Sequence, residues 1–164
     1  MARRAITLLE LLAVVAIVGI IIVLLSPLIN STREQARRHM CAENLRRISL
    51  ALHNYSLDND GKFPDDLSGL FNRYINDVKV FICPSDLDAS DIAQDGSDID
   101  ATTSYLYSRG WSEKDPLETV LACDKNDIFG KDTNHRGKGG NVVHLSGEAK
   151  WVDTADWVDP ADKE

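Results

Sequence analysis

The sequence predicts an α+β fold in which a long N-terminal helix packs on a small antiparallel β-sheet. Two observations predict this fold class. Residues 6–57 begin with an apolar run and continue with apolar residues at helical spacing. The rest of the chain has short β-branched and aromatic segments that are separated by polar turns. A helix packed on a small sheet buries the apolar side of both elements.

The first element is an apolar run from Leu11 to Ile29, in which 14 of 19 residues are Leu, Ile or Val. A helix of this length rises about 28 Å, close to the roughly 30 Å hydrocarbon thickness of a bilayer. We therefore predict a transmembrane helix over residues 6–29. Arg3 and Arg4 precede it and favour a cytoplasmic N-terminus, with the bulk of the chain across the membrane.

Two simpler interpretations of this run are an ordinary secretory signal peptide and a plain uncleaved anchor. The run exceeds the roughly 7–15 apolar residues of a signal-peptide core, and no Ala-x-Ala-like site follows Ile29. A plain anchor leaves Glu10 unexplained, because a carboxylate is costly in lipid.

The segment Arg3-Arg4-Ala5-Ile6-Thr7-Leu8-Leu9-Glu10-Leu11-Leu12 resembles the class III prepilin signal of type IV pilins and type II secretion pseudopilins. The resemblance implies a leader of residues 1–5, cleavage between Ala5 and Ile6 by prepilin peptidase, and N-methylation of Ile6. The sequence departs from the family pattern at two positions: Ala5 stands where Gly is usual, and Ile6 where Phe or Met is usual. Because Ala is also small, we still expect processing.

Glu10 falls at the fifth position of the processed chain. In the family the matching Glu neutralises the N-terminal amine of a neighbouring subunit, which implies that Glu10 is an assembly residue facing Ile6 of the next copy. Pro27 stands where filament pilins often carry a helix-bending proline; alternatively, it only marks the end of the anchor. Ser31 and Glu34 have capping-box spacing, which predicts a new helix start.

Residues 30–57 are predicted to form an amphipathic continuation of the helix. Its apolar residues recur at steps of four and three, which places them on one stripe. These residues are Cys41, Leu45, Ile48, Leu52 and Tyr55. We expect this stripe to be buried against the sheet.

Residues 58–164 are predicted to form an extracytoplasmic, β-rich globular domain. The candidate strands cover residues 78–83, 104–108, 119–123, 141–145 and 148–152. Ser146 and Gly147 have the composition of a two-residue hairpin turn between the last two strands. Four side chains of this hairpin are expected on one face: Val143, Leu145, Ala149 and Trp151.

Several short segments also resemble a pilin-like subfamily with a processing-associated C-terminal motif. They are Ala36-Arg37-Arg38, Cys41-x-x-Asn44-Leu45-Arg46, Asn59-Asp60-Gly61-Lys62-Phe63-Pro64 and Cys83-Pro84-Ser85-Asp86. The closing motif is usually a His, nine residues and Asp-Gly. Here the stretch from His135 to Gly147 has one extra residue, and Ser146 replaces the Asp.

Residues 86–100 are rich in aspartate. The six carboxylates are those of Asp86, Asp88, Asp91, Asp95, Asp98 and Asp100. They repel one another unless they are solvated or bridged by a cation. Major pseudopilins often bind calcium in a C-terminal loop, so the resemblance makes this segment a candidate calcium site. A solvated loop is the alternative, and the spacing fits no coordination pattern.

The three cysteines are Cys41, Cys83 and Cys123, so at least one has no partner within the chain. No Cys-x-x-Cys spacing is present, which argues against a zinc or thioredoxin-like site. An oxidising compartment allows a disulfide. We favour Cys83–Cys123, because each ends a predicted strand and Cys41 has a place on the helix stripe. Three buried thiols are the alternative.

Charge divides the chain, with a balance of +4 over residues 1–53 and −12 over residues 54–164. The acidic part argues against nucleic-acid binding, which needs a cationic surface. His135 and His144 invite a catalytic interpretation, but no nucleophile or acid accompanies them in a recognisable motif. We therefore expect no enzymatic activity.

The resemblance favours a pseudopilin, a subunit of a type II secretion pseudopilus or a type IV pilus-like filament. The expected partners are prepilin peptidase, other pilin-like subunits and an inner-membrane assembly platform. The expected location is the bacterial inner membrane, with a single span, a cytoplasmic N-terminus and a periplasmic C-terminal domain. The alternative is a static, membrane-anchored extracytoplasmic domain that binds calcium or a protein ligand.

Overall fold

The computed structural model describes residues 8–86, 92–125, 134–153 and 162–163 of the 164-residue chain, with backbone alone for residues 25–30 and 136–137. The chain divides into two compact units, residues 1–35 and 36–164, and each is described by itself.

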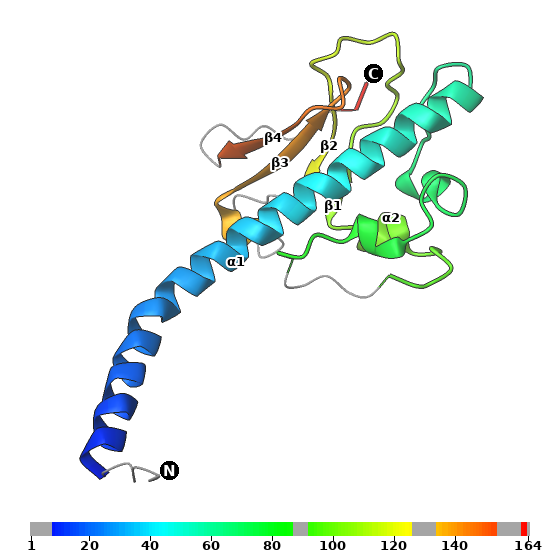
Figure 1. The fold of residues 1–164 in the computed structure, drawn as a ribbon. Helices are drawn as coiled ribbons and strands as arrows, with labels where there is room; N and C mark the ends of the chain where they lie inside the picture. The colour runs from blue at the N-terminus through cyan, green and yellow to red at the C-terminus, as the bar shows by residue number, and fades with distance from the viewer. Residues whose placement is uncertain (1–7, 87–91, 126–133, 154–161, 164) are drawn as a thin grey trace, which may run out of the picture. The chain divides into compact units, whose positions relative to one another are not determined.

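The helix α1 runs from Leu8 to Asp58 and contributes to both units (Figure 1). Pro27 lies within it, and the predicted new start at Ser31 is wrong, because one helix covers both residues. A proline removes a single backbone donor, and the helical pairing on both sides carries α1 past this gap.

Among the residues that the structure describes, no helix contains a stretch long and apolar enough to cross a membrane. The predicted span of residues 6–29 begins before the first described residue, and it stays a prediction.

The second unit contains a four-stranded antiparallel sheet in the order β1-β2-β3-β4. Its strands are β1 (Tyr105–Tyr107), β2 (Val120–Asp124), β3 (Gly139–His144) and β4 (Ala149–Asp153). The four predicted strands between residues 104 and 152 are therefore confirmed to within a few residues. β3 and β4 form the predicted hairpin, with Ser146 and Gly147 in its turn, and Gly147 adopts a φ of 79° that favours glycine.

Short helical turns connect the larger elements. They are η1 (Leu67–Leu70), η2 (Val78–Phe81), α2 (Ile99–Thr102) and η3 (Asn134–Gly137). The predicted strand over residues 78–83 is wrong, because its first four residues form η2. The Asp77 carboxylate accepts a hydrogen bond from the Lys79 amide at 3.0 Å, which stabilises a turn in place of an extended chain.

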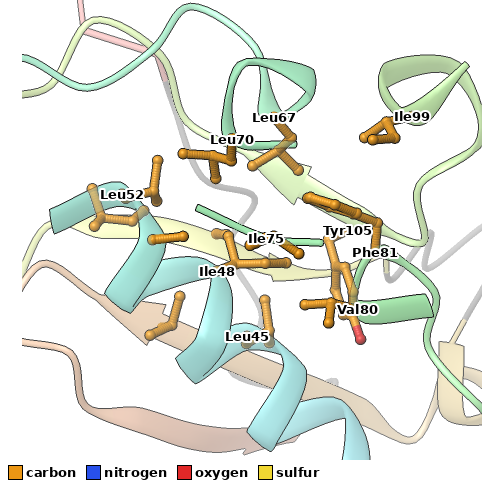
Figure 2. Close-up of a cluster of buried hydrophobic side chains, with 14 of the residues drawn as sticks. Leu45, Ile48, Leu52, Leu67, Leu70, Ile75, Val80, Phe81, Ile99 and Tyr105 are labelled. Atoms are coloured by element: carbon orange, nitrogen blue, oxygen red, sulfur yellow. The ribbon is translucent and has the colours of Figure 1, made fainter. Parts of the chain in front are cut away.

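The predicted stripe of α1 packs against the sheet and the turns. Cys41, Leu45, Ile48 and Leu52 have no exposed surface, and Tyr55 packs at the edge of the same core. Figure 2 shows side chains of α1 gathered with those of η1, η2 and β1, which include Leu70, Phe81 and Tyr105. The α+β fold class is confirmed: a long N-terminal helix packs on an antiparallel sheet in a pilin-like arrangement.

The sheet register separates two faces. Ala122, Val143 and Ala149 lie on the face of the sheet that packs against α1. Asn141 and Trp151 form a cross-strand pair two residues further along β3 and β4, and so they lie on the same face. The predicted common face of the β3–β4 hairpin is therefore confirmed. Cys123 and Val142 are paired on the opposite face, where they form a separate small apolar cluster with Leu106, Val120 and Val152.

Candidate functional site

The predicted processing residues Ala5 and Ile6 lie outside the described residues. Glu10 is described: it is the acidic residue in the first turn of α1, and it is exposed. Pro27 is placed only by its backbone, within α1.

The part of α1 between Leu8 and Leu24 is apolar around its whole circumference. Its large apolar side chains are all exposed within this part, from 48% for Val18 to 84% for Leu8. A helix that is apolar on every side is stable when lipid or other helices cover it. This part of α1 is therefore the first candidate site, a surface for packing.

The aspartates of the acidic segment do not converge where they are described. Asp95, Asp98 and Asp100 accept hydrogen bonds from three separate backbone amides, those of Ser97, Ala93 and Ser68. The Ser97 amide is also the main cause of a lowered pKa of Asp95. Asp88 and Asp91 lie outside the described residues.

Asp86 lies in the described chain, but within that part no group of three acidic side chains is placed to share an ion. The described aspartates therefore do not gather at one point, and calcium binding by the whole segment stays a prediction.

The predicted disulfide Cys83–Cys123 is wrong, and Cys83 is instead bonded to Cys41. Cys41 lies on the buried stripe of α1 and its Cα is 5.2 Å from that of Cys83, which follows η2. Cys123 lies outside the disulfide and is buried on the opposite face of the sheet, and so it faces away from Cys83. The disulfide indicates an oxidising, extracytoplasmic location for the second unit, because cytosolic thiols are kept reduced.

A pair of titratable side chains lies beside this disulfide. Asp124 ends β2 and His135 lies in η3, and neither has any exposed surface. The Nε2 atom of His135 is 3.1 Å from Oδ2 of Asp124 and 3.6 Å from Sγ of Cys83. We call Cys41, Cys83, Asp124 and His135 the buried cluster.

Two asparagines hold the carboxylate of Asp124 in place. Asn141 donates to its Oδ2 atom from the backbone amide at 2.7 Å and from the side chain at 2.9 Å. Asn134 donates to Oδ1 at 3.1 Å and to the carbonyl of Ser104 at 2.8 Å. Several donors to one carboxylate offset much of the cost of burying its charge.

The buried cluster is connected to α1 by more than the disulfide. The side chain of Asn141 also donates to the carbonyl of Arg38 at 3.2 Å. The guanidinium of Arg38 lies 3.9 Å from the centre of the Trp151 ring, and that ring meets His135 edge-on at 5.2 Å. A cation over an aromatic face is a stabilising contact, so this stack covers the imidazole from the β4 side.

Tyr105 links the same region to the core. Asn44 of α1 donates to its hydroxyl at 3.3 Å and to the carbonyl of Ile82 at 3.0 Å. Burial raises the pKa of the Tyr105 hydroxyl, and the nearby charge of Asp124 raises it further.

Sequence reasoning missed the acid and the sulfur that accompany His135. The cluster joins four separate segments of the chain, and no motif spacing in the sequence groups them. One signal was available: Asp124 follows directly on the apolar segment Val120 to Cys123, where a carboxylate is costly unless it has partners. His144 lies at the end of β3, with Nδ1 3.4 Å from the carbonyl of Glu148, apart from this cluster.

The comparisons cover a limited part of the chain. Residues 30–67 match the model of the family SBP_bac_10, described as a protein of unknown function (DUF1559). This segment contains the buried stripe of α1 and the first residue of η1, and it includes one member of the buried cluster, Cys41. No curated protein matches the chain, and no solved structure does so.

Proposed function

We propose that this chain is a non-enzymatic, pilin-like subunit that assembles through the N-terminal part of α1. Prepilin peptidase would cut between Ala5 and Ile6 and methylate Ile6, and the subunit would then join a type II secretion pseudopilus or a type IV pilus-like filament. The observation that carries this proposal is the exposed apolar part of α1 from Leu8 to Leu24, which has the carboxylate of Glu10 in its first turn.

Packing in a filament accounts for this surface energetically. Exposing one Leu, Ile or Val side chain to water costs about 1.5–3 kcal/mol, so outside the lipid these residues of α1 are stable only when other helices cover them. In the second unit, by contrast, the stripe from Cys41 to Leu52 is already covered by the unit's own core. The two parts of α1 therefore suit different partners: other subunits for the first, and the globular fold for the second.

The proposed location is the bacterial inner membrane, with a single span, a cytoplasmic N-terminus and the second unit in the periplasm. Arg3 and Arg4 support this orientation, and the Cys41–Cys83 disulfide supports an oxidising compartment for the second unit. The other proposed partners are pilin-like subunits of the same or related sequence and an inner-membrane assembly platform.

The absence of enzymatic activity is part of the proposal. The combination of Cys83, His135 and Asp124 has the residue types of a catalytic group, but all three are fully buried. The sulfur of Cys83 is also bonded to Cys41, so it is not a nucleophile in this state.

A Glu10→Leu variant tests the assembly role. We expect it to reach the membrane in normal amount but to lose filament assembly, measured by shearing, sedimentation and cross-linking between subunits. Glu43→Leu is the matched control, because Glu43 is an exposed carboxylate of the same helix, and its ion-pair partners in the described part of the chain are Arg46 and Arg47. Normal assembly of Glu10→Leu, or equal loss in both variants, would contradict the proposal.

A further inference from the structure

We propose that the buried cluster is a Zn²⁺ site when the Cys41–Cys83 disulfide is reduced. The ligands are the two cysteine Sγ atoms, Nε2 of His135 and one carboxylate oxygen of Asp124. The disulfide and the metal site are then two alternative states of the same four residues.

The distances within the cluster suit one tetrahedral ion. The four ligand atoms all lie within 4.8 Å of one another. The separation of 3.6 Å between Sγ of Cys83 and Nε2 of His135 is close to the roughly 3.5 Å expected when both bind one Zn²⁺. Nε2 of His135 and Oδ2 of Asp124, at 3.1 Å, are similarly close to the roughly 3.3 Å expected of a nitrogen and an oxygen ligand.

The two sulfurs must separate. In the disulfide they are bonded, whereas two thiolates on one Zn²⁺ lie about 3.8 Å apart. Side-chain rotation at Cys41 and Cys83 can provide this separation, because their Cα atoms are already 5.2 Å apart and each residue comes from a different segment.

The donor set and its surroundings favour zinc. Thiolates, an imidazole and a carboxylate are all ligand types that Zn²⁺ binds, and four of them suit its tetrahedral geometry. Protein zinc sites also need residues that orient the ligands. Asn134 and Asn141 do this for the carboxylate of Asp124, and the ring of Trp151 packs against the imidazole of His135.

Two features of the cluster are unexpected for a disulfide with a purely structural role. A disulfide needs no polar neighbours, yet a fully buried imidazole and carboxylate lie against it. His135 also has a φ of 56°, a left-handed backbone conformation that is unfavourable for an L-residue. This backbone presents the imidazole to the cluster, and local strain of this kind is concentrated at functional sites.

The conversion between the two states balances as follows. A dithiol supplies two electrons and two protons to the Cys41–Cys83 bond and leaves as its own disulfide, so both cysteines become thiols. Zn²⁺ then replaces the two thiol protons, which are released to solvent, and His135 binds as the neutral imidazole. The bound site carries a net charge of −1, whereas the same thiolates and carboxylate without metal would carry −3 in a buried location.

The sequence argued against a zinc site because it has no Cys-x-x-Cys spacing. The structure removes that objection, since α1, the segment after η2, the end of β2 and η3 each contribute one ligand.

The test uses the purified full chain in detergent, either oxidised or reduced with a phosphine and kept free of oxygen. Co²⁺ replaces Zn²⁺ as a spectroscopic probe. We expect the reduced chain to bind one Co²⁺, with the visible bands of a tetrahedral ion and a thiolate-to-cobalt charge-transfer band, and to release it to Zn²⁺. The oxidised chain should show none of these bands at the same Co²⁺ concentration.

Two variants and one control identify the ligands. Cys83→Ser and Asp124→Asn should each weaken Co²⁺ binding by at least about 10–100-fold, since loss of a ligand costs no less than loss of a residue that orients one. Cys123→Ala removes the thiol outside the cluster and should bind as the natural chain does. Circular dichroism of each reduced, metal-free variant establishes that it is folded. The comparison of the oxidised with the reduced natural chain tests the proposal without any variant.

The proposal is overturned if the reduced natural chain binds no Co²⁺, or if it binds with octahedral spectra that lack the thiolate band. Equal binding by the oxidised chain, or by a folded Cys83→Ser variant, would overturn it as well. None of these outcomes depends on filament assembly, so the test is separate from that of the proposed function.

Discussion

The carboxylate of Asp124 and the imidazole of His135 form a fully buried pair, with 3.1 Å between Oδ2 and Nε2. The pair lies where β2, η3 and β3 meet α1, because Asn141 of β3 bonds both Asp124 and the backbone of α1. It therefore contributes to how the helix is held on the sheet.

Replacing Asp124 by Ala should lower the free energy of unfolding by about 3–5 kcal/mol, because buried donors of Asn134 and Asn141 lose their acceptor. Urea denaturation followed by circular dichroism measures the change. Glu148→Ala is the control, since the Glu148 side chain is exposed and its ion-pair partner among the described residues is the exposed Lys150; its effect should stay below about 0.5 kcal/mol. Similar losses for both variants would contradict this account.

Removing the disulfide should also destabilise the second unit. Cys41 and Cys83 are separated by 42 residues, and closing a loop of this size contributes about 4 kcal/mol through the unfolded chain. A Cys41→Ala/Cys83→Ala double variant should lose roughly this amount in urea denaturation with a metal chelator present. The Cys123→Ala variant should still be more stable to urea when oxidised than when reduced. If this difference in the free energy of unfolding disappeared, the assigned pairing would be wrong.

Alkaline pH should destabilise the fold through its buried tyrosines. Burial raises the pKa of Tyr105 and of Tyr107 above the ordinary value of 10.0. Below pH 10 both hydroxyls are neutral in the folded and unfolded chains, so the contribution of the two tyrosines to the free energy of unfolding is fully present. Above pH 10 the unfolded chain loses protons that the folded chain keeps, and stability falls by about 1.4 kcal/mol per pH unit for each tyrosine.

The Tyr105→Phe variant isolates this effect. The free energy of unfolding, measured in urea between pH 9 and pH 12, should fall less steeply in the variant by about 1.4 kcal/mol per pH unit. At pH 7 the variant should lose only about 1 kcal/mol, because Asn44 keeps its bond to the carbonyl of Ile82. An unchanged slope would show that Tyr105 ionises in the folded chain.

Gly139 is required where β3 pairs with β4. It has a φ of 129°, and a Cβ there would collide with the backbone oxygen of Val152. Gly139→Ala should therefore lower the free energy of unfolding by about 3 kcal/mol or more. Gly147→Ala is the matched control: it also has a positive φ but open space around it, so it should cost only about 1 kcal/mol. Thermal melts of the two variants measure the two losses of stability. Equal losses would contradict the predicted collision between a Cβ at residue 139 and the Val152 oxygen.

Much of the fold could be predicted from local pattern. The spacing of Cys41, Leu45, Ile48 and Leu52 determines a buried helix face, and the Ser146-Gly147 turn determines which residues of the hairpin share a side. Residues 78–81 were harder, because a short apolar run suits a buried turn as well as a strand, and the hydrogen bond that the Lys79 amide donates to the Asp77 carboxylate selects the turn.

The buried cluster could not be predicted in the same way. Asp124 and His135 are close in sequence, but their approach to Cys41 and Cys83 depends on how α1 and the segment after η2 pack against the sheet. The disulfide partner of Cys83 likewise depends on which face of β2 holds Cys123. That face is hard to predict, because an irregularity between Val120 and Ala122 shifts the register of β2 against β3.

The most direct test of the central claim is the intact mass and N-terminal sequence of the protein from membranes, with prepilin peptidase present and absent. We predict a peptidase-dependent start at N-methylated Ile6, with residues 1–5 removed. A chain that retains those residues in both samples would contradict the assignment as a pilin-like subunit and would favour a fixed membrane anchor.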